Sequence, residues 1–329
     1  MKKSFKALVT IQNNDGTYIN IVKERTTNEL PDGDLLIQVE YSSLNYKDAL
    51  SASGIKGITT QYPHTPGIDA AGIVEKSNNS DFPPGTSVIV TGFDLGMNTS
   101  GGFSEYICVP SKWAIRCPNN LTTQEAMMIG TAGLTVGLSI AEINERCKIK
   151  DANIIISGAT GGVGSLAVKL CSLLGARVTA ITGKMSKKDF LLDLGASKII
   201  ERDEFINGTR HPLNKGLYNG AIDVVGGDIL SCIIASMDYN GIIAACGNAG
   251  GPKFESTVFP FILRGNHLIG IDSANCSIER RKNVWERFSK DWKLNGLDKI
   301  CKTVDLDGVI PEIAKILKGK QTGRILLEL

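Results

Sequence analysis

The sequence SGATGGVG at residues 157–164 constrains the fold of this chain more than any other feature. It follows the apolar run ANIIIS and precedes the helical pattern GVGSLAVKLCSLLG, so a strand, a glycine turn and a helix are expected in that order. Glycines let backbone amides approach a pyrophosphate, and the helix N-terminus presents free N–H groups to it. The spacing is G-x-x-G-x-x-G, with Ala159 in place of the first glycine of G-x-G-x-x-G. A tight packing turn is the alternative, but the strand and helix around the loop favour a dinucleotide site.

Strand-like and helical segments alternate after this point. The apolar runs NIIISG, RVTAIT, KIIE, GAIDVVG and GIIAACG are separated by helical patterns. Regular alternation with fully apolar strands predicts a parallel sheet covered by helices on both faces. We therefore expect an α/β protein in which residues 121–282 form a doubly wound Rossmann domain.

The remaining sequence predicts a β-rich domain. Residues 1–120 contain short β-branched or alternating runs between turn clusters such as NNDG, PDGD and FPPG. A helix is expected from TTQEAMMIG, with Thr122 or Thr123 as its N-cap and Glu125 in the first turn. The tail 283–329 ends in the alternating TGRILLEL, a strand expected to rejoin the first domain. That domain would then comprise residues 1–120 and 283–329.

The segment after the second strand of the predicted Rossmann domain bears on which dinucleotide binds. An acidic residue about 20 residues beyond the glycine loop binds the ribose 2′-hydroxyl of NAD. Here Thr182, Gly183 and Lys184 occupy that place, and the first carboxylate, Asp189, comes later. Lys184 and Arg202 are cations that suit a 2′-phosphate, so NADPH is predicted over NADH. A lysine-rich, solvated helix start is the alternative.

The composition limits the kinds of binding partner that are expected for this chain. The 329 residues carry a formal net charge of +2, which gives no reason to expect nucleic acid or an anionic membrane. The N-terminus lacks a signal-peptide pattern, and no run approaches about 18 uninterrupted apolar residues, so a soluble cytoplasmic protein is expected. The eight cysteines are scattered without the spacing of a zinc knuckle.

Several segments resemble a known family. They are SSLNYKDAL from Ser42, PHTPGIDAAG from Pro63, IGTAGLTV from Ile129, PFILRGNHLIGIDS from Pro260 and ERR from Glu279. Together with the domain order, they are similar to the medium-chain dehydrogenase/reductase superfamily and, within it, to the zinc-independent YhdH/YhfP-type group. The resemblance covers nearly the whole chain. It implies a GroES-like catalytic domain beside a Rossmann NADP-binding domain, a homodimer, and NADPH-dependent reduction of acryloyl-CoA.

The same resemblance sets the chain apart from the zinc alcohol dehydrogenases of the superfamily. Those enzymes hold catalytic zinc partly through a Cys in a C-H-x-D-like segment and a His in a G-H-E-like segment. Here Asn45 and Ile68 stand at those positions, and neither replaces a thiolate or an imidazole as a zinc ligand. No metal site is expected, and alcohol oxidation is disfavoured. Hydride addition to an activated C=C bond remains feasible, because oriented donors alone can stabilise the enolate.

Candidate catalytic residues lie in the turn LNYKD, which we expect to face the nicotinamide. Asn45 is expected to donate to the substrate carbonyl, and Tyr46 to pack on or hydrogen-bond the nicotinamide end of NADPH. Asp48 is a candidate for proton transfer, with structural pairing, for example to Lys47, as the alternative.

The resemblance also implies a set of cofactor contacts along the chain. Arg264 is left open between anchoring an acidic group of the substrate and a salt bridge in a dimer interface, and His64, between Pro63 and Pro66, is expected to shape a rigid turn. The predicted cofactor-binding residues are Tyr46, Thr160, Gly161, Gly162, Val163, Thr182, Gly183, Lys184, Arg202, Asn248, Ile262 and Ser273.

The sequence therefore predicts an NADPH-dependent reductase of an α,β-unsaturated thioester such as acryloyl-CoA. An NADPH:quinone oxidoreductase is the alternative enzyme. A protein that binds NADPH without turnover, as a sensor, is the alternative from another class.

Overall fold

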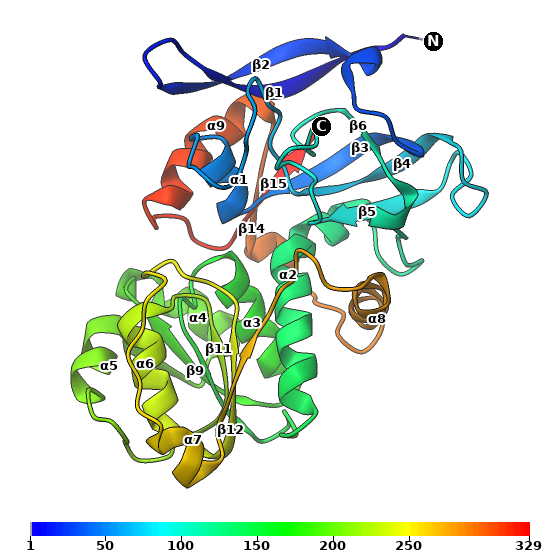
Figure 1. The fold of residues 1–329 in the computed structure, drawn as a ribbon. Helices are drawn as coiled ribbons and strands as arrows, with labels where there is room; N and C mark the ends of the chain where they lie inside the picture. Colours follow the sequence, from blue (N-terminus) through cyan, green and yellow to red (C-terminus); the bar gives the residue numbers. More distant parts are fainter. Residues whose placement is uncertain (1) are drawn as a thin grey trace. The chain divides into compact units, whose positions relative to one another are not determined.

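The computed structural model describes residues 2–329 and divides into two compact units. One comprises the chain up to Thr131 together with Ala274–Leu329, and the other is Ala132–Ser273. Figure 1 shows the β-rich character of the first and the layered helices and strands of the second. Each unit is described by itself.

The second unit is built on a six-stranded, all-parallel sheet. Its strand order is β10-β9-β8-β11-β12-β13, which is 3-2-1-4-5-6 in chain order, the arrangement of a dinucleotide-binding Rossmann domain. The Rossmann prediction is thereby confirmed. The strands are β8 (Asn153–Ile156), β9 (Arg177–Thr182), β10 (Lys198–Glu201), β11 (Tyr218–Asp223), β12 (Met237–Ala245) and β13 (His267–Gly270).

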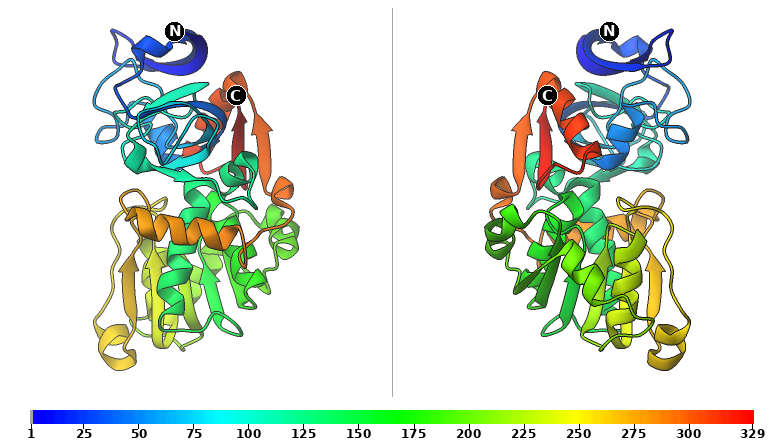
Figure 2. Two further views of the ribbon diagram at one scale, coloured as in Figure 1. Left: turned by 90° about the vertical axis from the view of Figure 1, so that its right-hand side faces the viewer. Right: turned by 90° about the vertical axis from the view of Figure 1, so that its left-hand side faces the viewer.

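Helices cover both faces of this sheet, as Figure 2 shows. Because side chains alternate along a strand, Ile155 joins a core cluster with Phe205 and Ile233, whereas a Cβ at Gly220 would meet Ile154 and Ile143. Phe205 lies on α5, Ile233 on α6 and Ile143 on α2, so opposite faces receive different helices. The helices of the unit, besides part of α2 (Thr123–Asn144), are α3 (Gly162–Leu173), α4 (Lys188–Asp193), α5 (Arg202–Gly208), α6 (Gly227–Ser236) and α7 (Phe259–Arg264).

The first unit contains a two-stranded hairpin and a seven-stranded sheet. The final strand pairs antiparallel with β3, from Ile325 opposite Leu44 to Glu328 opposite Tyr41, so the predicted return of the C-terminus is confirmed. Within the described residues, three α-helices lie wholly in this unit, namely α1 (Tyr46–Ser51), α8 (Ile278–Phe288) and α9 (Leu306–Leu317), and the unit also holds the start of α2 up to Thr131. Its strands are β1 (Ser4–Gln12), β2 (Tyr18–Thr26), β3 (Leu35–Leu44), β4 (Asp69–Ser77), β5 (Ser87–Thr91), β6 (Tyr106–Val109), β7 (Ala114–Arg116), β14 (Cys301–Val304) and β15 (Arg324–Glu328).

Helix α2 begins at a capping box and is broken once. Glu125 N donates to Thr122 Oγ1 and Thr122 N donates to Glu125 Oε2, both at 3.0 Å, which identifies Thr122 as the N-cap. Gly130 interrupts the helix with φ 53° and ψ −159°. By length and composition alone, α2 is the one helix in residues 2–329 that could cross a membrane, but 78% of its most apolar window is buried in the protein. The expectation from the sequence counted only uninterrupted apolar runs and so passed over this helix.

The units divide at positions other than the predicted 120/121 and 282/283. The start of α2 stays with the β-rich unit because Asp69 of β4 accepts a hydrogen bond from Thr131 N, 2.9 Å away. All of α8 stays there too, because the buried Arg281 donates to Thr91 O and Ala274 O, each at 2.6 Å. Both ties join residues far apart in the chain, and composition does not reveal them.

Candidate functional site

The glycine loop lies between β8 and the N-terminus of α3, as predicted. Gly161 N donates to Gly158 O at 2.9 Å, which closes the turn, and Gly161 is the N-cap of the helix. A Cβ on Gly164 would lie 2.3 Å from Gly158 O, so only glycine lets the helix pack this closely on the loop. The first N–H groups of α3 have no acceptor within the helix. The loop is therefore shaped to receive a pyrophosphate.

A buried carboxylate fixes the start of this loop. Asp223, at the end of β11, accepts hydrogen bonds from Ser157 Oγ at 2.6 Å and from Gly226 N at 2.8 Å. Burial raises the pKa of Asp223 above its usual range, although these donors oppose the shift. Since β8 and β11 are neighbours on either side of the point where the strand order reverses, Asp223 ties the two strands together at the place where such folds bind nucleotides.

Residues predicted to recognise the 2′-phosphate gather at the end of β9. Thr182 is the last residue of β9, and its Oγ1 accepts from Lys184 N at 3.0 Å. The Arg202 guanidinium lies beside Gly183, with Nη1 3.3 Å from where a Cβ of Gly183 would be. Burial, together with the charge of Lys187, lowers the pKa of Lys184. Two cationic residues, Lys184 and Arg202, thus lie near the end of β9, where an NAD-specific domain would carry an acid.

Arg202 already has an anionic partner in the protein. Its Nε lies 2.8 Å from Asp203 Oδ1, and the Arg202 side chain is half exposed. An exposed ion pair of this kind contributes little to stability, so the guanidinium can turn to a phosphate at small cost.

The other predicted cofactor residues of this unit lie on the loop after β8 and on loops and a helix that follow β12. Thr160 Oγ1 lies 3.3 Å from Thr182 Oγ1, which joins the glycine loop to the end of β9, and Ser273 Oγ accepts from Thr135 Oγ1 at 2.8 Å. Asn248 is exposed after β12, and Ile262 is 69% exposed on α7. Gly162 and Val163 form the first turn of α3.

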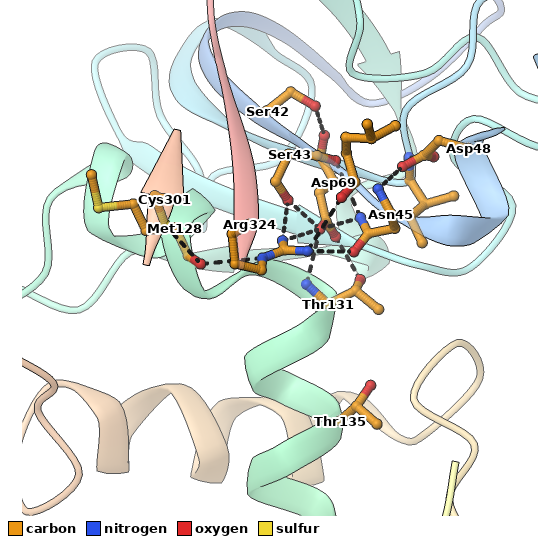
Figure 3. A network of polar contacts seen from close by, with 12 residues as sticks. Ser42, Ser43, Asn45, Asp48, Asp69, Met128, Thr131, Thr135, Cys301 and Arg324 are labelled. Carbon is orange, nitrogen blue, oxygen red and sulfur yellow. Dashed lines mark hydrogen bonds and ion pairs between the residues drawn. The ribbon is translucent and has the colours of Figure 1, made fainter. Parts of the chain in front are cut away.

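In the first unit, Asn45 belongs to a buried polar network (Figure 3). Its Nδ2 donates to Asp69 Oδ2 at 2.8 Å and to Ser43 O at 3.2 Å, and its Oδ1 accepts from Arg324 Nη1 at 3.0 Å. An amide has only two N–H hydrogens. Both already have acceptors inside the protein, so donation from Asn45 to a substrate carbonyl, which stays a prediction, would require the amide to give up one of these bonds.

Asp48 is buried and bonded to backbone on both sides. Its Oδ2 accepts from Asn45 N and its Oδ1 from Ile68 N, each at 2.7 Å. Burial, with a smaller contribution from the nearby Asp69 carboxylate, raises the pKa of Asp48 to about 7, although the two N–H donors oppose the shift. The side chain has no exposed surface, so the geometry favours the structural alternative, with backbone N–H groups as partners in place of Lys47.

Tyr46 is the exposed member of the turn. It is the first residue of α1, and 42% of its surface is exposed, although tyrosine is usually more buried than this. Its ring is free to pack on a flat group such as a nicotinamide.

Two residues of undecided role are now placed. The Arg264 guanidinium donates to three carbonyls of its own unit, those of Ala235, Met237 and Asn214, and a contact with a substrate or a dimer partner stays a prediction. His64 pairs through its backbone with Thr10, and burial lowers the pKa of its ring. A turn-forming role fits His64.

Comparison with known proteins gives full-length relatives. Residues 31–119 match the alcohol dehydrogenase GroES-like domain family, and residues 162–290 match the zinc-binding dehydrogenase family. The chain is 40% identical over 331 residues, 100% of both chains, to YhfP of Bacillus subtilis, which is named as a candidate quinone oxidoreductase. It is 36% identical to the acrylyl-CoA reductase AcuI of Ruegeria pomeroyi, covering 98% of this chain and 99% of that one. The chain belongs to the YhdH/YhfP-type group of medium-chain dehydrogenases/reductases.

Solved structures of this group share the fold. Escherichia coli YhdH with bound NADPH has a TM-score of 0.93 and 38% identity, with 98% of this chain and 99% of that chain covered. Bacillus subtilis YhfP with NAD bound has a TM-score of 0.96 and 39% identity, with 99% and 100% covered. YhfP and the YhdH protein of Salmonella enterica are named oxidoreductases, and the two solved structures above hold different nicotinamide nucleotides.

The zinc implied by one family description does not fit the residues of this YhdH/YhfP-type chain. The Asn45 side-chain amide is hydrogen-bonded within the network, and Ile68 is a buried alkyl side chain. Within residues 2–329, no group of three or more His, Cys, Asp and Glu side chains could hold a metal ion. This place offers an amide, a guanidinium, a hydroxyl and the single Asp69 carboxylate, which already accepts hydrogen bonds from Ser43, Asn45 and Thr131, and it offers no thiolate or imidazole to zinc.

We expect the purified protein to contain less than about 0.1 zinc per chain, because a thiolate and imidazole donor set is missing. Elemental analysis by mass spectrometry measures this directly. Incubation with EDTA should leave the rate of NADPH oxidation unchanged within about 20%, well short of the loss that removal of a catalytic metal causes. Stoichiometric zinc, or loss of activity restored by zinc, would contradict the donor-set argument.

Sequence reasoning missed the partners of Asn45. Asp69 was visible in the segment GID, next to the isoleucine that replaces a zinc ligand, and an acidic residue beside that position was a usable signal. Arg324, in TGRILLEL, carried no signal, because only the pairing of β15 with β3 brings it to Asn45.

Proposed function

We propose that this protein is an NADPH-dependent reductase of the C=C bond of an α,β-unsaturated thioester of the acryloyl-CoA type. The observation that carries the proposal is the replacement of both metal-ligand positions by Asn45 and Ile68, with the amide of Asn45 already hydrogen-bonded. The full-length likeness to a protein named acrylyl-CoA reductase supports it.

NADPH would supply a hydride to the β-carbon of the thioester, and a proton would then reach the α-carbon to give the saturated acyl-CoA. In this proposal the glycine loop binds the pyrophosphate, while Lys184 and Arg202 bind the 2′-phosphate. The relatives hold either NADPH or NAD, so the choice rests on the two cations beside Gly183. Tyr46 contacts the nicotinamide.

The direct test follows NADPH absorbance with acryloyl-CoA and, separately, with small quinones such as 1,4-benzoquinone. We expect oxidation with acryloyl-CoA and formation of propanoyl-CoA, identified by mass spectrometry. Fast turnover with quinones and none with acryloyl-CoA would instead support the quinone oxidoreductase, which the name of YhfP favours. Tight NADPH binding without oxidation by either acceptor would support a sensor.

We also propose that the protein is a homodimer that joins through β13 and α7. Strand β13 is the edge of its sheet and leaves one row of backbone N–H and C=O groups for another strand. Large apolar side chains are exposed on α7 and at its N-cap. They are Val258 (61%), Phe259 (45%), Ile262 (69%) and Leu263 (56%).

We expect the double variant Val258→Asp, Leu263→Asp to sediment at about half the mass of the unaltered protein, because charges at the centre of an apolar interface remain unpaired. Sedimentation velocity measures this. Leu173→Asp, which adds a charge at an apolar side chain of the same unit that is 52% exposed on α3, is the control and should leave the mass unchanged. A monomeric unaltered protein refutes the dimer.

A further inference from the structure

The Asp69 carboxylate holds two segments of the first unit at once. Its Oδ2 accepts from Ser43 Oγ at 2.6 Å and from Asn45 Nδ2 at 2.8 Å. The same carboxylate accepts from Thr131 N at 2.9 Å and from Thr131 Oγ1 at 2.5 Å. One side chain therefore binds both the turn that carries Asn45 and the broken helix α2.

Arg324 makes the matching set of contacts from the other side. Its guanidinium donates to Asn45 Oδ1 at 3.0 Å, to Ser43 Oγ at 2.7 Å and to the carbonyls of Leu44 and Met128, each at 3.3 Å. Its Nη2 lies 3.8 Å from Asp69 Oδ2, and both side chains are almost fully buried. As a result, the Asn45 amide is held at its oxygen by the cation and at its nitrogen by the anion.

The pair also matches the charges at the break in α2. The carbonyl of Met128, before Gly130, accepts from Arg324, and the N–H of Thr131, after it, donates to Asp69. A cation thus meets the negative end of one helical segment and an anion meets the positive end of the next. A Cβ on Gly130 would lie 2.6 Å from Arg324 Nη2, from Asp69 Oδ2 and from Ser43 Oγ, so the break is packed directly on the network.

Stability alone is a weak reason for a buried ion pair. Desolvation offsets much of the attraction, and well-packed apolar side chains often serve as well. Conformational specificity is the better-attested use, and here the bonds fix one amide, one turn and one helix break in a single arrangement.

We propose that the Asp69–Arg324 pair is the positioning centre of the candidate catalytic turn. The pair orients Asn45 and, through it, sets the direction of the neighbouring Tyr46 ring relative to α2. This inference rests on the proposed function, in which Tyr46 contacts the nicotinamide. Asp69, Arg324 and Asn45 are positioning residues in it.

Two conservative substitutions test the pair with less risk to folding than the removal of either buried charge. Arg324→Lys keeps the charge but loses the fork of donors, and Thr131→Val keeps the shape but removes the hydroxyl bond to Asp69 at 2.5 Å. We expect each to lower kcat with acryloyl-CoA about tenfold or more, the cost of a misplaced reacting geometry. KM for NADPH should stay within about twofold, because the glycine loop and the cations that bind its phosphates are untouched.

A double-mutant cycle tests whether Arg324 acts through Asn45. Asn45→Ala should lower kcat about as much as Arg324→Lys, and the double variant should be no slower than the slower single variant within about twofold. Ser139→Ala is the control. It removes a buried hydroxyl of α2 that bonds only its own helix, at Thr135 O, and should leave kcat unchanged.

Amide hydrogen exchange supplies a readout that does not need turnover. In Arg324→Lys and Thr131→Val, peptides covering 43–51 and 126–135 should gain exchange together, while strands β8 and β12 stay protected. If the unaltered protein oxidises NADPH with neither acceptor, the proposed function is refuted. The positioning role of the Asp69–Arg324 pair is then judged from the hydrogen-exchange data alone. The inference fails if a folded Arg324→Lys or Thr131→Val variant keeps kcat within about twofold, if losses in the cycle multiply, or if the two segments respond independently.

Discussion

Replacing Lys184 and Arg202 by alanine together should raise KM for NADPH by about 100-fold or more, while KM for NADH changes by less than about threefold. Each cation would make a charge-assisted hydrogen bond to the 2′-phosphate, worth about 1.5 to 3 kcal/mol. NADH lacks the 2′-phosphate and therefore makes neither bond. Partial exposure of both side chains makes the lower end of that range appropriate. Steady-state kinetics with both nucleotides and a fixed acyl-CoA measure the change.

A matched control lies on the same strand as Arg202. Lys198 is exposed at the first residue of β10, whereas Arg202 follows the last, so Lys198→Ala removes an equal charge at the opposite end. It should leave both KM values unchanged. Equal losses for NADPH and NADH in the double variant would show that the two cations do not recognise the 2′-phosphate.

Asp48→Asn should reverse its effect on stability between low and high pH. The pKa of Asp48 rises from 3.8 to about 7 in the folded protein, so the folded state binds its proton more tightly than the unfolded state. That contribution is fully present below about pH 4 and is lost as pH rises through 7. A pKa difference of about three units corresponds to about 4 kcal/mol of unfolding free energy, which the unaltered protein loses between low and high pH. The variant has no ionisable group at this position, so its stability does not fall for this reason.

At pH 4 we expect the variant to be less stable than the unaltered protein by about 1 to 3 kcal/mol, because an amide offers only one oxygen to the two N–H donors. At pH 8 it should be as stable or more stable. Urea unfolding followed by tryptophan fluorescence suits the measurement, since Trp113, Trp285 and Trp292 all lie in the unit that contains Asp48.

The control for this pH series is Asp32→Asn, the same chemical change at an exposed position of the same unit. Its difference from the unaltered protein should not change with pH. A difference for Asp48→Asn that is constant from pH 4 to 8 would mean that Asp48 ionises as freely in the folded protein as in the unfolded chain.

The fold was predictable where local patterns carry it. Apolar strands separated by helical patterns predicted the parallel sheet, and the alternating tail TGRILLEL predicted a strand that rejoins the first domain, where the structure pairs it with β3. The capping box at Thr122 and the lack of an acidic residue at the end of β9 are also features of short sequence segments. The structure forms the capping box at Thr122 and ends β9 at Thr182, as expected.

The candidate site was harder to predict, because its bonds join distant segments. Asn45 looked available to a substrate until Asp69, Ser43 and Arg324 were seen to use both its hydrogens and its oxygen. Arg264 had no partner in sequence and three carbonyl partners in space. The limits of the units shifted for the same reason, since Thr131 and Arg281 are held by β4 and β5.

The break in α2 also has a consequence for the mutational tolerance of the chain. Gly130 lies one residue before the end of the first segment of the first unit, and every substitution would add a Cβ 2.6 Å from a carboxylate oxygen, a hydroxyl and a guanidinium nitrogen. Its φ of 53° adds backbone strain for any side chain. In a library with all amino acids at each position of α2, position 130 should therefore tolerate among the fewest substitutions. This is the opposite of the usual case, in which replacing a glycine inside a helix stabilises the protein.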